Sequence, residues 1–324
     1  MTAVTLRFMV DPLPKPANYT SGEGPFPKRL LDIEPALAGL RLDQALARLF
    51  PKESRSRLAR LVAAGAVLVD GACTRPRHKL RGGERLEVTF LPRPEEAAFR
   101  AEEIALDVIH EDDDVLVIAK PAGLVVHPGS GNWAGTMLNA LLHRVPALKS
   151  LPRAGIVHRL DKETSGLLVV AKHEAAMQDL VRQLQARTVK RTYLAIARGA
   201  VAAQGVIEAP IGRHPTQRTR MAVVPGGKAA VTRYRVRERF ESHALLECDL
   251  ETGRTHQIRV HLASIGHPLE GDPLYGARGA RRLPRQALHA WKLAFVHPGT
   301  GKQVHFTAAP PADFEALADE LRKP

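Results

Sequence analysis

The amino-acid sequence predicts an α+β fold divided between two domains. Its 324 residues are too many for one ordinary domain and enough to bury a sizeable core. A proline-containing, acidic stretch at residues 91–103 is typical of a linker between domains. Beyond it, strand-like runs are interleaved with few helical patterns, which favours α+β over alternating βαβ units. These runs are residues 114–120, 167–172, 189–197 and 244–250.

Composition indicates a soluble protein with a polyanionic partner. A formal net charge of +13 favours nucleic acid, because each neutralised phosphate releases counterions and stabilises the complex. Membrane lipid is the competing polyanion, but no strongly basic amphipathic helix or lipidation signal occurs. No apolar run approaches the length of a membrane span. On charge alone, a basic surface that merely keeps the protein soluble remains an alternative.

Cysteine usage and the N-terminus indicate a reducing compartment. Cys73 and Cys248 lie far apart and form no C-x-x-C pair, which argues against a disulfide framework and against a zinc site. The opening MTAVTLRFMV lacks the long apolar core of a signal peptide. We therefore expect a cytoplasmic protein.

The first 92 residues divide into an extension and a small domain. Residues 1–37 are rich in proline and show no sustained apolar period, so we predict a flexible extension. Residues 38–92 then open with two short helices, the second capped by Ser54 or Ser56. Two short strands, VLV before an Asp-Gly turn and RLEV after a Gly-Gly pair, follow them. The expected buried helical positions are Leu42, Ala45, Leu46, Leu49, Leu58, Leu61 and Val62.

This small unit, with SRSRLARLVAAGAVLVDG at its centre, resembles the S4 RNA-binding domain. The resemblance implies that the second helix lays Arg55, Arg57 and Arg60 along an RNA backbone. Residues 41–85 carry 11 basic and 4 acidic side chains, a net of +7, which agrees with such a role. A solvated helix face is the usual explanation of an isolated charge run, but here the resemblance covers the whole unit.

The segment GIVHRLDKETSGLLVVAK, residues 155–172, places a dense polar cluster between two apolar runs. Rigid flanking strands fix side chains well, so a loop of this kind is a common place for catalysis. We expect one cleft to receive His158, Arg159, Asp161, Thr164 and Ser165. From these residues alone, a charged surface loop is an equally good interpretation.

HRLDKETSG resembles the signature of RluA-type pseudouridine synthases, and the similarity extends over about residues 104–310. HEDDDVLVIAKPAGLVVHPGSG precedes the signature, and VKRTYLAIARG, TGRTHQIRVHLASIGHPLEGDPLYG and QALHAWKLAFVHP follow it in the family's order. The resemblance implies a catalytic domain over residues 104–324, built on a mixed or antiparallel sheet. It also implies an isomerase that converts uridine to pseudouridine in RNA without a cofactor.

The resemblance assigns catalytic roles to three residues. Asp161 is implied to attack or deprotonate the uridine sugar, and Arg259 to pair with it. Tyr193 is implied to stack on the uracil and is a candidate for removing its carbon 5 proton, although a core tyrosine is the alternative. A neighbouring cation keeps a partly buried carboxylate ionised, and Arg254 is a second candidate for this pairing. Water must be kept from the detached base, and expected apolar walls are Val157, Leu160 and Leu167.

Arg259 falls in a helix expected to open near Thr255 and to end at Gly266, which buries Ile258, Leu262 and Ile265. His256 and His261 on this segment are five positions apart, on different helix faces, so a structural or RNA-contacting role is favoured over a metal. We assign His256 and Arg254 to RNA contact and expect no metal.

Further RNA contacts are expected from arginines near the signature and in a loop. The resemblance implies that Arg159 enters the RNA helix in place of the extruded uridine, since flipping a base loses stacking energy; a phosphate contact is the alternative. The loop arginines are more consistent with RNA backbone contact than with an exposed solubilising loop. They are Arg278, Arg281, Arg282 and Arg285.

Two other classes of function compete with the isomerase. A non-catalytic RNA-binding assembly factor would tolerate loss of the carboxylate, and a glycosylase would release free uracil and usually needs a second carboxylate for water. The catalytic residues favour the isomerase. The combination with an S4-like domain most resembles enzymes acting on large-subunit ribosomal RNA, with transfer RNA as the alternative substrate. We expect a monomer with RNA, and no membrane, as its partner.

Overall fold

The computed structural model describes residues 28–91, 98–129, 131–276 and 282–323. The chain forms two compact units, residues 1–96 and 97–324. No helix in the described ranges is long and apolar enough to cross a membrane.

The smaller unit packs two helices against a four-stranded antiparallel sheet of order β1-β4-β2-β3. Its helices bury the apolar positions predicted from their spacing, except that Leu49 is only partly buried. The Ser54 hydroxyl caps the second helix by accepting the Arg57 N–H. The elements are β1 (Lys28–Asp32), a 3₁₀ turn (Pro35–Leu37), α1 (Leu42–Leu49), α2 (Arg55–Ala63), β2 (Val67–Val69), β3 (Ala72–Cys73) and β4 (Arg85–Thr89).

The predicted boundary of this domain at residue 38 is wrong. Residues 28–32 pair along their whole length with β4, and Leu31 and Ile33 are buried in the core of the unit. Five residues between prolines are too short to show a sheet period, so only the partner strand reveals them as a strand. Residues 28–37 therefore belong to the small domain, whereas residues 1–27 lie outside the described ranges.

The predicted linker at residues 91–103 is corrected in its second half. The Asn139 side-chain amide donates to the carbonyl oxygens of Ala98 and Arg100, and Ala98 is buried. Residues 98–103 therefore pack on the larger unit, and residues 92–97 lie outside the described ranges.

The larger unit is built on a nine-stranded mixed sheet of order β5-β6-β7-β14-β8-β13-β12-β9, with β15 also paired to β14. Among the described pairs, β7 and β14 run parallel and the others antiparallel, so the predicted α+β class is confirmed. The strands of this sheet are β5 (Asp107–Glu111), β6 (Val115–Lys120), β7 (Ser165–Ala171), β8 (Lys190–Arg198), β9 (Gln204–Glu208), β12 (Val231–Arg239), β13 (His243–Leu250), β14 (Leu288–Val296) and β15 (Gln303–Thr307). A separate two-stranded sheet pairs β10 (Ile211–Arg213) with β11 (Met221–Val223). The helices are α4 (Met137–Arg144), α5 (Glu174–Gln185), α6 (Gln257–Ser264) and α7 (Ala312–Arg322), with 3₁₀ turns at Pro146–Ser150 and Pro152–Gly155.

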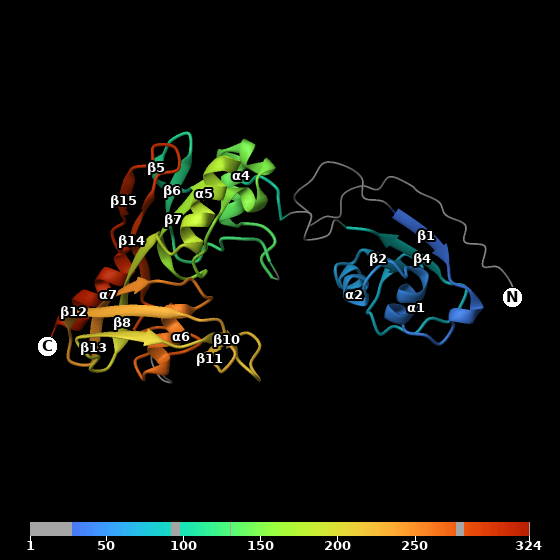
Figure 1. Cartoon of the computed structure of the whole chain (residues 1–324). Coiled ribbons are helices and arrows are strands. Elements are labelled where there is room, and N and C mark those ends of the chain that lie inside the picture. Colours follow the sequence, from blue (N-terminus) through green and yellow to red (C-terminus); the bar gives the residue numbers. More distant parts are fainter. Residues whose placement is uncertain (1–27, 92–97, 130, 277–281, 324) are drawn as a thin grey trace. The chain divides into compact units, whose positions relative to one another are not determined.

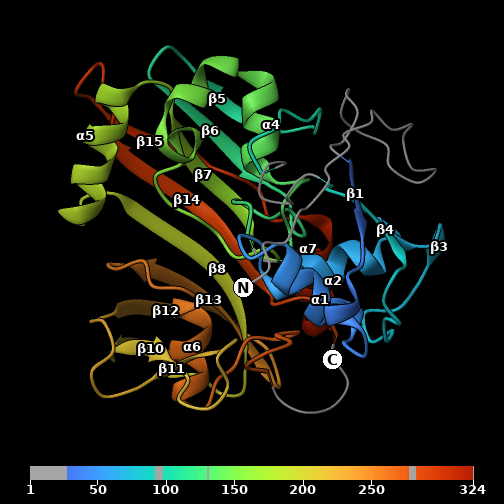
Figure 2. The same ribbon diagram turned by 90° about the vertical axis from the view of Figure 1, so that its right-hand side faces the viewer.

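Alternation along β6 and β7 divides the core into two layers. The even-numbered residues 116, 118, 168 and 170 pack with α4, and the odd-numbered residues 115, 117, 167 and 169 pack with α5. Figure 2 shows these strands between the two helices. Successive side chains of a strand point to opposite faces, and both faces of these strands are buried. This explains why the strands appear in the sequence as continuous apolar runs. All four predicted strands form.

The short parallel contact between β7 and β14 decides where the signature loop lies. Gly166, with φ +111°, faces Ala290 so closely that an added Cβ would lie 2.2 Å from the Ala290 carbonyl oxygen. Only glycine fits this approach. Because Ala290 also pairs with Tyr193 on β8, the loop before β7 opens beside Tyr193 at the middle of the sheet.

Candidate active site

A cavity of about 820 Å³ opens on the α6 side of the sheet. This volume is of the size that holds a nucleotide. Its walls come mainly from four separate segments: the signature loop with the residues before it (153–164), the end of α5 with the following turn (181–187), β8 (191–193) and the turn into α6 (250–259). His127 and Leu288 complete them. The tertiary fold thus brings together the motifs that the sequence presents far apart.

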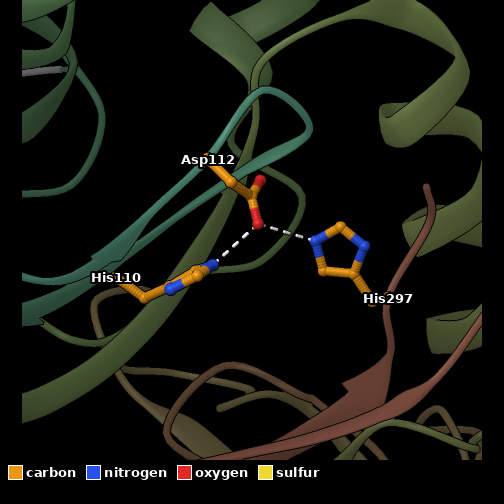
Figure 3. A group of neighbouring side chains, drawn as sticks. All are labelled: His110, Asp112 and His297. Atoms are coloured by element: carbon orange, nitrogen blue, oxygen red, sulfur yellow. Dashed lines mark hydrogen bonds and ion pairs between the residues drawn. The ribbon is translucent and has the colours of Figure 1, made fainter. Parts of the chain in front are cut away.

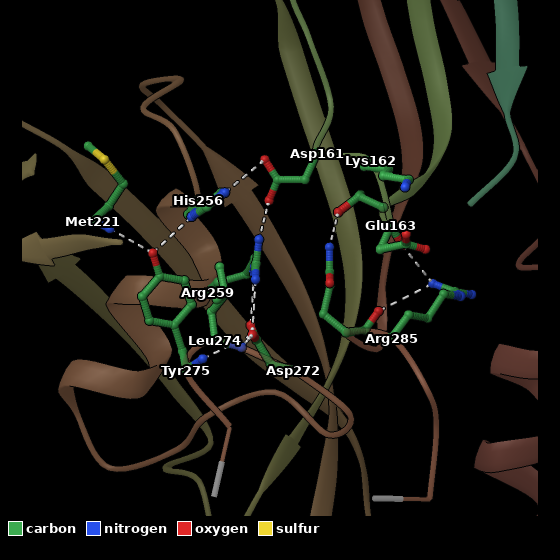
Figure 4. A network of polar contacts seen from close by, with 12 residues as sticks. Asp161, Lys162, Glu163, Met221, His256, Arg259, Asp272, Leu274, Tyr275 and Arg285 are labelled. Atoms are coloured by element: carbon green, nitrogen blue, oxygen red, sulfur yellow. Dashed lines mark hydrogen bonds and ion pairs between the residues drawn. The ribbon is translucent and has the colours of Figure 1, made fainter. Parts of the chain in front are cut away.

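Asp161 lies in this cavity and is held by Arg259 (Figure 4). The Arg259 Nη1 donates to Asp161 Oδ2 at 2.8 Å, while its Nε and Nη2 donate to the two oxygens of Asp272 at 2.8 and 3.0 Å. Arg259 and Asp272 are buried, whereas the Asp161 side chain keeps 19% of its surface exposed to the cavity. The arginine therefore bridges a buried carboxylate and an accessible one.

Charge compensation sets the ionisation of this network. Burial alone would lower the pKa of Arg259, but the hydrogen bonds and charges of Asp272 and Asp161 raise it above its ordinary value. Burial likewise opposes ionisation of Asp272, yet Arg259 holds the pKa of that carboxyl below its usual range. Both groups are therefore charged at neutral pH.

The helix that carries Arg259 begins later and ends earlier than predicted. The helix α6 spans Gln257–Ser264, and His256 before it adopts a left-handed conformation with φ +58°. Ile258 and Leu262 are buried as expected, but Ile265 lies beyond the last turn and is 40% exposed. The left-handed residue turns the chain sharply, which sets His256 beside the cavity instead of on the helix.

His256 approaches the carboxylate oxygen of Asp161 that Arg259 does not bind (Figure 4). Its Nε2 lies 3.8 Å from Asp161 Oδ1, and its Nδ1 lies 2.8 Å from the Tyr275 hydroxyl oxygen, which accepts the Met221 N–H. The tyrosine hydrogen is available to donate to Nδ1, and this tautomer points the imidazole N–H at Nε2 toward Asp161. Burial lowers the pKa of His256 against the opposing charge of Asp161, which keeps the ring neutral.

Tyr193 forms part of the cavity wall, on the face of β8 that carries the α4-side core. The ring is 6% exposed. Burial raises the pKa of its phenol, the nearby Arg191 cation opposes this rise, and Asp161 adds to it. The phenol therefore stays neutral, and its ring at the cavity wall can stack on a planar base.

Backbone anchors fix the residues that follow Asp161. The buried Lys120 ammonium donates to the carbonyl oxygens of Pro121, Leu124 and Lys162 at 2.7–3.0 Å. Gln286 donates its side-chain amide to the Thr164 hydroxyl, and both groups are buried. The loop is therefore held at two positions directly after Asp161, which limits the orientations open to its carboxylate.

Other predictions for the signature loop have mixed outcomes. Val157 and Leu160 line the cavity, but Leu167 packs toward α5 on the opposite face of the sheet. Ser165 also turns away, since its hydroxyl lies 2.9 Å from the Nδ1 of His289, whose Nε2 donates to a backbone carbonyl. His158 lines the cavity and accepts the Val169 N–H through Nε2.

The predicted RNA contacts at the cavity are placed differently. Arg159 is exposed and lines the cavity, and no hydrogen bond or ion pair joins it to another described residue. Arg254 also lines the cavity but donates to the Ala229 carbonyl oxygen and does not pair with Asp161. Arg285 is the clear correction: it is buried and bidentate to Asp313 at 2.7 Å, so it is no surface contact for RNA.

The remaining loop arginines and His261 make internal contacts or lie outside the described ranges. Arg282 is paired with Glu320, and Arg278 and Arg281 lie outside the described ranges. His261 is buried, with Thr232 and Ala209 as hydrogen-bond partners, which makes its role structural.

The second helix of the small unit presents two of its three predicted cations. Arg55 and Arg60 are exposed. Arg57 is instead held inside the unit: it pairs with Glu53 at 2.8 Å, donates to the Leu91 carbonyl oxygen and lies over the Phe90 ring. The prediction that Arg57 lies along RNA is therefore corrected.

Three histidine and carboxylate side chains away from the cavity could suggest a metal site (Figure 3). Asp112 Oδ2 lies 2.7 Å from His110 Nε2 and 2.8 Å from His297 Nε2. However, His297 Nδ1 accepts the N–H groups of Gly299 and Thr300, which places its proton on Nε2, toward Asp112. No lone pair on that nitrogen then remains for a metal, so the cluster fits a hydrogen-bonded clasp better than a metal centre.

Several cavity residues were not singled out from the sequence. They are His127, Arg153, Arg187 and Arg191 on the walls, with Lys120, Asp272 and Tyr275 behind them. Arg191 lies two positions before Tyr193, and the alternation of a strand would have placed both on one face. The others depend on contacts between distant segments.

Comparison with known proteins agrees with this geometry. Residues 114–264 match the family model described as RNA pseudouridylate synthase, and residues 40–86 match the S4 domain. A protein of Nitrosomonas europaea, named ribosomal large subunit pseudouridine synthase D, is 55% identical over 300 residues, covering 90% of this chain and 87% of its own. The chain belongs to the RNA pseudouridylate synthase family. It is accordingly an isomerase that acts on RNA.

Further relatives of this pseudouridylate synthase agree. A protein of the same name from Pseudomonas aeruginosa is 50% identical over 309 residues, covering 91% of this chain and 96% of its own. The solved structure of human RNA pseudouridylate synthase domain containing 1 matches with a TM-score of 0.53 and 26% identity, over 69% of this chain and 97% of its own. The predicted family, the S4 domain and the enzyme class are confirmed.

Proposed function

We propose that this synthase isomerises uridines in large-subunit ribosomal RNA, with Asp161 as its catalytic carboxylate. The main observation in support of this proposal is the accessible Asp161 carboxylate, which Arg259 holds in a nucleotide-sized cavity that Tyr193 also lines. The names of the relatives, which act on the ribosomal large subunit, support this choice of substrate over transfer RNA.

The reaction requires one carboxylate and the returning base. Asp161, kept ionised by Arg259, attacks or deprotonates the uridine sugar, and the bond from the sugar carbon 1′ to the ring nitrogen breaks. The uracil stays in the cavity, turns, and bonds to carbon 1′ of the sugar through its carbon 5, which then loses its proton. If Asp161 attacked the sugar, this new bond displaces its carboxylate; if Asp161 removed a sugar proton, that proton returns to the sugar. No water is consumed, so a second, water-activating carboxylate is not needed.

The surrounding residues support base flipping and retention. Tyr193 offers a flat, buried wall on which the uracil stacks, and its raised pKa favours stacking over service as a base. Arg159, exposed and unpaired at the cavity mouth, fills the space that the flipped nucleotide leaves in the RNA. His256 and Arg254 contact the bound nucleotide or its flanking backbone.

The S4-like domain supplies affinity for the RNA backbone through Arg55 and Arg60. Other exposed cations of the same unit can extend this surface: Arg75, Arg77, Lys79 and Arg81. With ribosomal RNA as its substrate, we place the protein in the cytoplasm, as a monomer that needs no cofactor. Light scattering should then give a mass near 35.4 kDa.

The test is tritium release from RNA labelled at uridine carbon 5, with the wild type and Asp161→Asn compared on large-subunit ribosomal RNA and on transfer RNA. The proposal expects release by the wild type alone, from ribosomal RNA, without free uracil. Free uracil would indicate a glycosylase. Tritium release from transfer RNA alone would identify transfer RNA as the substrate. Equal release by the variant and the wild type would contradict the catalytic role of Asp161.

A further inference from the structure

Arg191 has a guanidinium group without a partner in the catalytic cavity. Its Nε is sealed from solvent, and among the described residues it is the buried side-chain nitrogen or oxygen that lacks a hydrogen bond. No hydrogen bond or ion pair links the rest of this half-buried group to another described side chain. An unsatisfied buried donor costs about 1–3 kcal/mol, more when charged, so its presence calls for an explanation.

The cavity itself offers Arg191 no carboxylate. Two acidic side chains line its walls, and both are already paired: Asp161 with Arg259 and Glu251 with Arg233. The same walls carry four further arginines: Arg153, Arg159, Arg187 and Arg254. The acceptor for Arg191 must therefore arrive with the substrate.

The position of Arg191 points to the nucleobase as that acceptor. Arg191 and Tyr193 lie two residues apart on β8, hence on the same face, and both line the cavity. If the uracil stacks on Tyr193 with its sugar at Asp161, the edge of the base extends toward the neighbouring residues of β8, among them Arg191. Because the Nε is sealed from solvent, it lies in the inner wall of the cavity, where a base would bind. A phosphate would instead pass along the exposed rim.

We propose that Arg191 is a catalytic residue that binds a carbonyl oxygen of the flipped uracil and stabilises the negative charge of the detached ring. This inference rests on the proposed uridine cavity. When the sugar–nitrogen bond breaks, its electron pair stays on the ring and delocalises onto the carbonyl oxygens. The new bond from carbon 5 then uses a ring electron pair, and the carbon 5 proton leaves. A fixed cation therefore acts most strongly on the detached state.

Gly253 shapes the seat of this guanidinium. A Cβ built on Gly253 would lie 2.7 Å from Arg191 Nη1, so the glycine leaves room for the arginine against the turn that leads into α6. The backbone of Gly253 is not in the left-handed region, so alanine is tolerated there without backbone strain. Gly253→Ala should displace the guanidinium without removing its charge.

The experiment compares wild type, Arg191→Met, Arg191→Lys and Gly253→Ala in single-turnover tritium release at saturating ribosomal RNA, with RNA affinity measured separately. We expect Arg191→Met to lower the rate about 10- to 100-fold, in line with the loss of one charge-stabilising donor. RNA affinity should change less than about threefold. Arg191→Lys should recover part of the rate, and Gly253→Ala should lose part of it.

Lys190→Met is the matched control, because Lys190 is the exposed neighbour on the other face of β8 and carries the same charge. An unchanged rate in Arg191→Met would overturn the inference. The inference would also fail if Arg191→Met bound RNA more weakly and with a lower salt dependence but kept a normal rate, because this result is the signature of a phosphate contact. If the wild type releases no tritium from any RNA, the proposed function fails as well, so the two failures are distinguishable.

Discussion

Arg259 lies between two carboxylates of unequal exposure, and this arrangement orients Asp161, the proposed catalytic carboxylate. Asp272 is fully enclosed and binds two nitrogens of the guanidinium, while Asp161 binds the third and faces the cavity. Asp272 also accepts the N–H groups of Leu274 and Tyr275, so it is fixed from behind. The buried carboxylate therefore positions the arginine that positions Asp161.

Asp272→Asn should reduce both stability and activity. Removing one partner of a buried ion pair leaves an uncompensated charge and costs about 3 kcal/mol. We expect a loss of this size in urea denaturation and at least about a tenfold lower single-turnover rate, since a misplaced carboxylate loses reactive geometry. Asp319→Asn, which breaks an exposed pair with Arg322, should change stability by less than about 0.5 kcal/mol. Equal effects of the two variants would contradict the positioning role.

Lys120 should make the stability of the protein rise with pH. Burial lowers its pKa from 10.5 to about 7, although Glu163 and Asp161 oppose the shift. Between these two values the unfolded chain binds more protons than the folded one, so stability increases from about pH 7 to pH 10. The slope approaches about 1.4 kcal/mol per pH unit.

Denaturant unfolding of the wild type and Lys120→Met across this pH range would measure the effect. Because other groups titrate in both proteins, the difference between them isolates Lys120. Lys302→Met, at an exposed site, is the control and should follow the wild type. Parallel curves for wild type and Lys120→Met would show that Lys120 stays protonated when folded.

At the scale of elements, Asp112 joins the turn after β5 to the turn after β14, in the hydrogen-bonded clasp with His110 and His297. Asp112, after β5, accepts from His110 and from His297 at the end of β14, together with the N–H groups of Asp114 and Val115. Burial opposes ionisation, but these donors lower the pKa of Asp112 below its usual range. Its contribution to stability is therefore present above about pH 4 and is lost as pH falls through the folded-state pKa.

Asp112→Asn should lower the Tm at pH 7 by about 2–6 °C, and the difference should shrink in acid. Because the proton of His297 occupies the nitrogen that faces Asp112, a chelator or added Zn²⁺ should leave the Tm of the wild type unchanged. Thermal scans check both statements. A Tm that rises with Zn²⁺ and falls with chelator would identify the cluster as a metal site.

Element prediction succeeded where a periodic pattern was long enough. β6, β7, β8 and β13 each bury a continuous face, and their apolar runs were recognised. β12 was missed because arginines occupy every second position of VTRYRVRER, and their cross-strand pairs with residues such as Glu247 are invisible in one segment. β1 was missed because its pattern is complete only when paired with β4.

At the scale of the whole molecule, the proposed function assigns RNA backbone binding to the small unit and the chemistry to the larger one. Arg55→Gln and Arg60→Gln should each weaken RNA binding several-fold and lower the salt dependence by about one counterion, because each removes one phosphate contact. The single-turnover rate at saturating RNA should stay unchanged. Filter binding across a salt series measures the effect.

Arg57→Gln is the contrasting variant within the same helix. Since Arg57 is held by Glu53 and Leu91, its loss should lower the stability of the small unit more than its RNA affinity. The division of roles would be refuted if Arg57→Gln changed the salt dependence as much as its neighbours.

The sequence by itself determined the class of fold and the family, and it singled out Asp161, Tyr193 and Arg259 as candidates, because local periodicity and ordered motifs are properties of short segments. The tertiary structure alone decided which groups meet. It paired Arg259 with Asp161 across 98 positions and placed Asp272 behind them. It also enclosed Arg285 and left Arg191 without a partner. The physical reason is that distances between side chains are set by strand pairing and packing over long sequence separations, which no local pattern encodes.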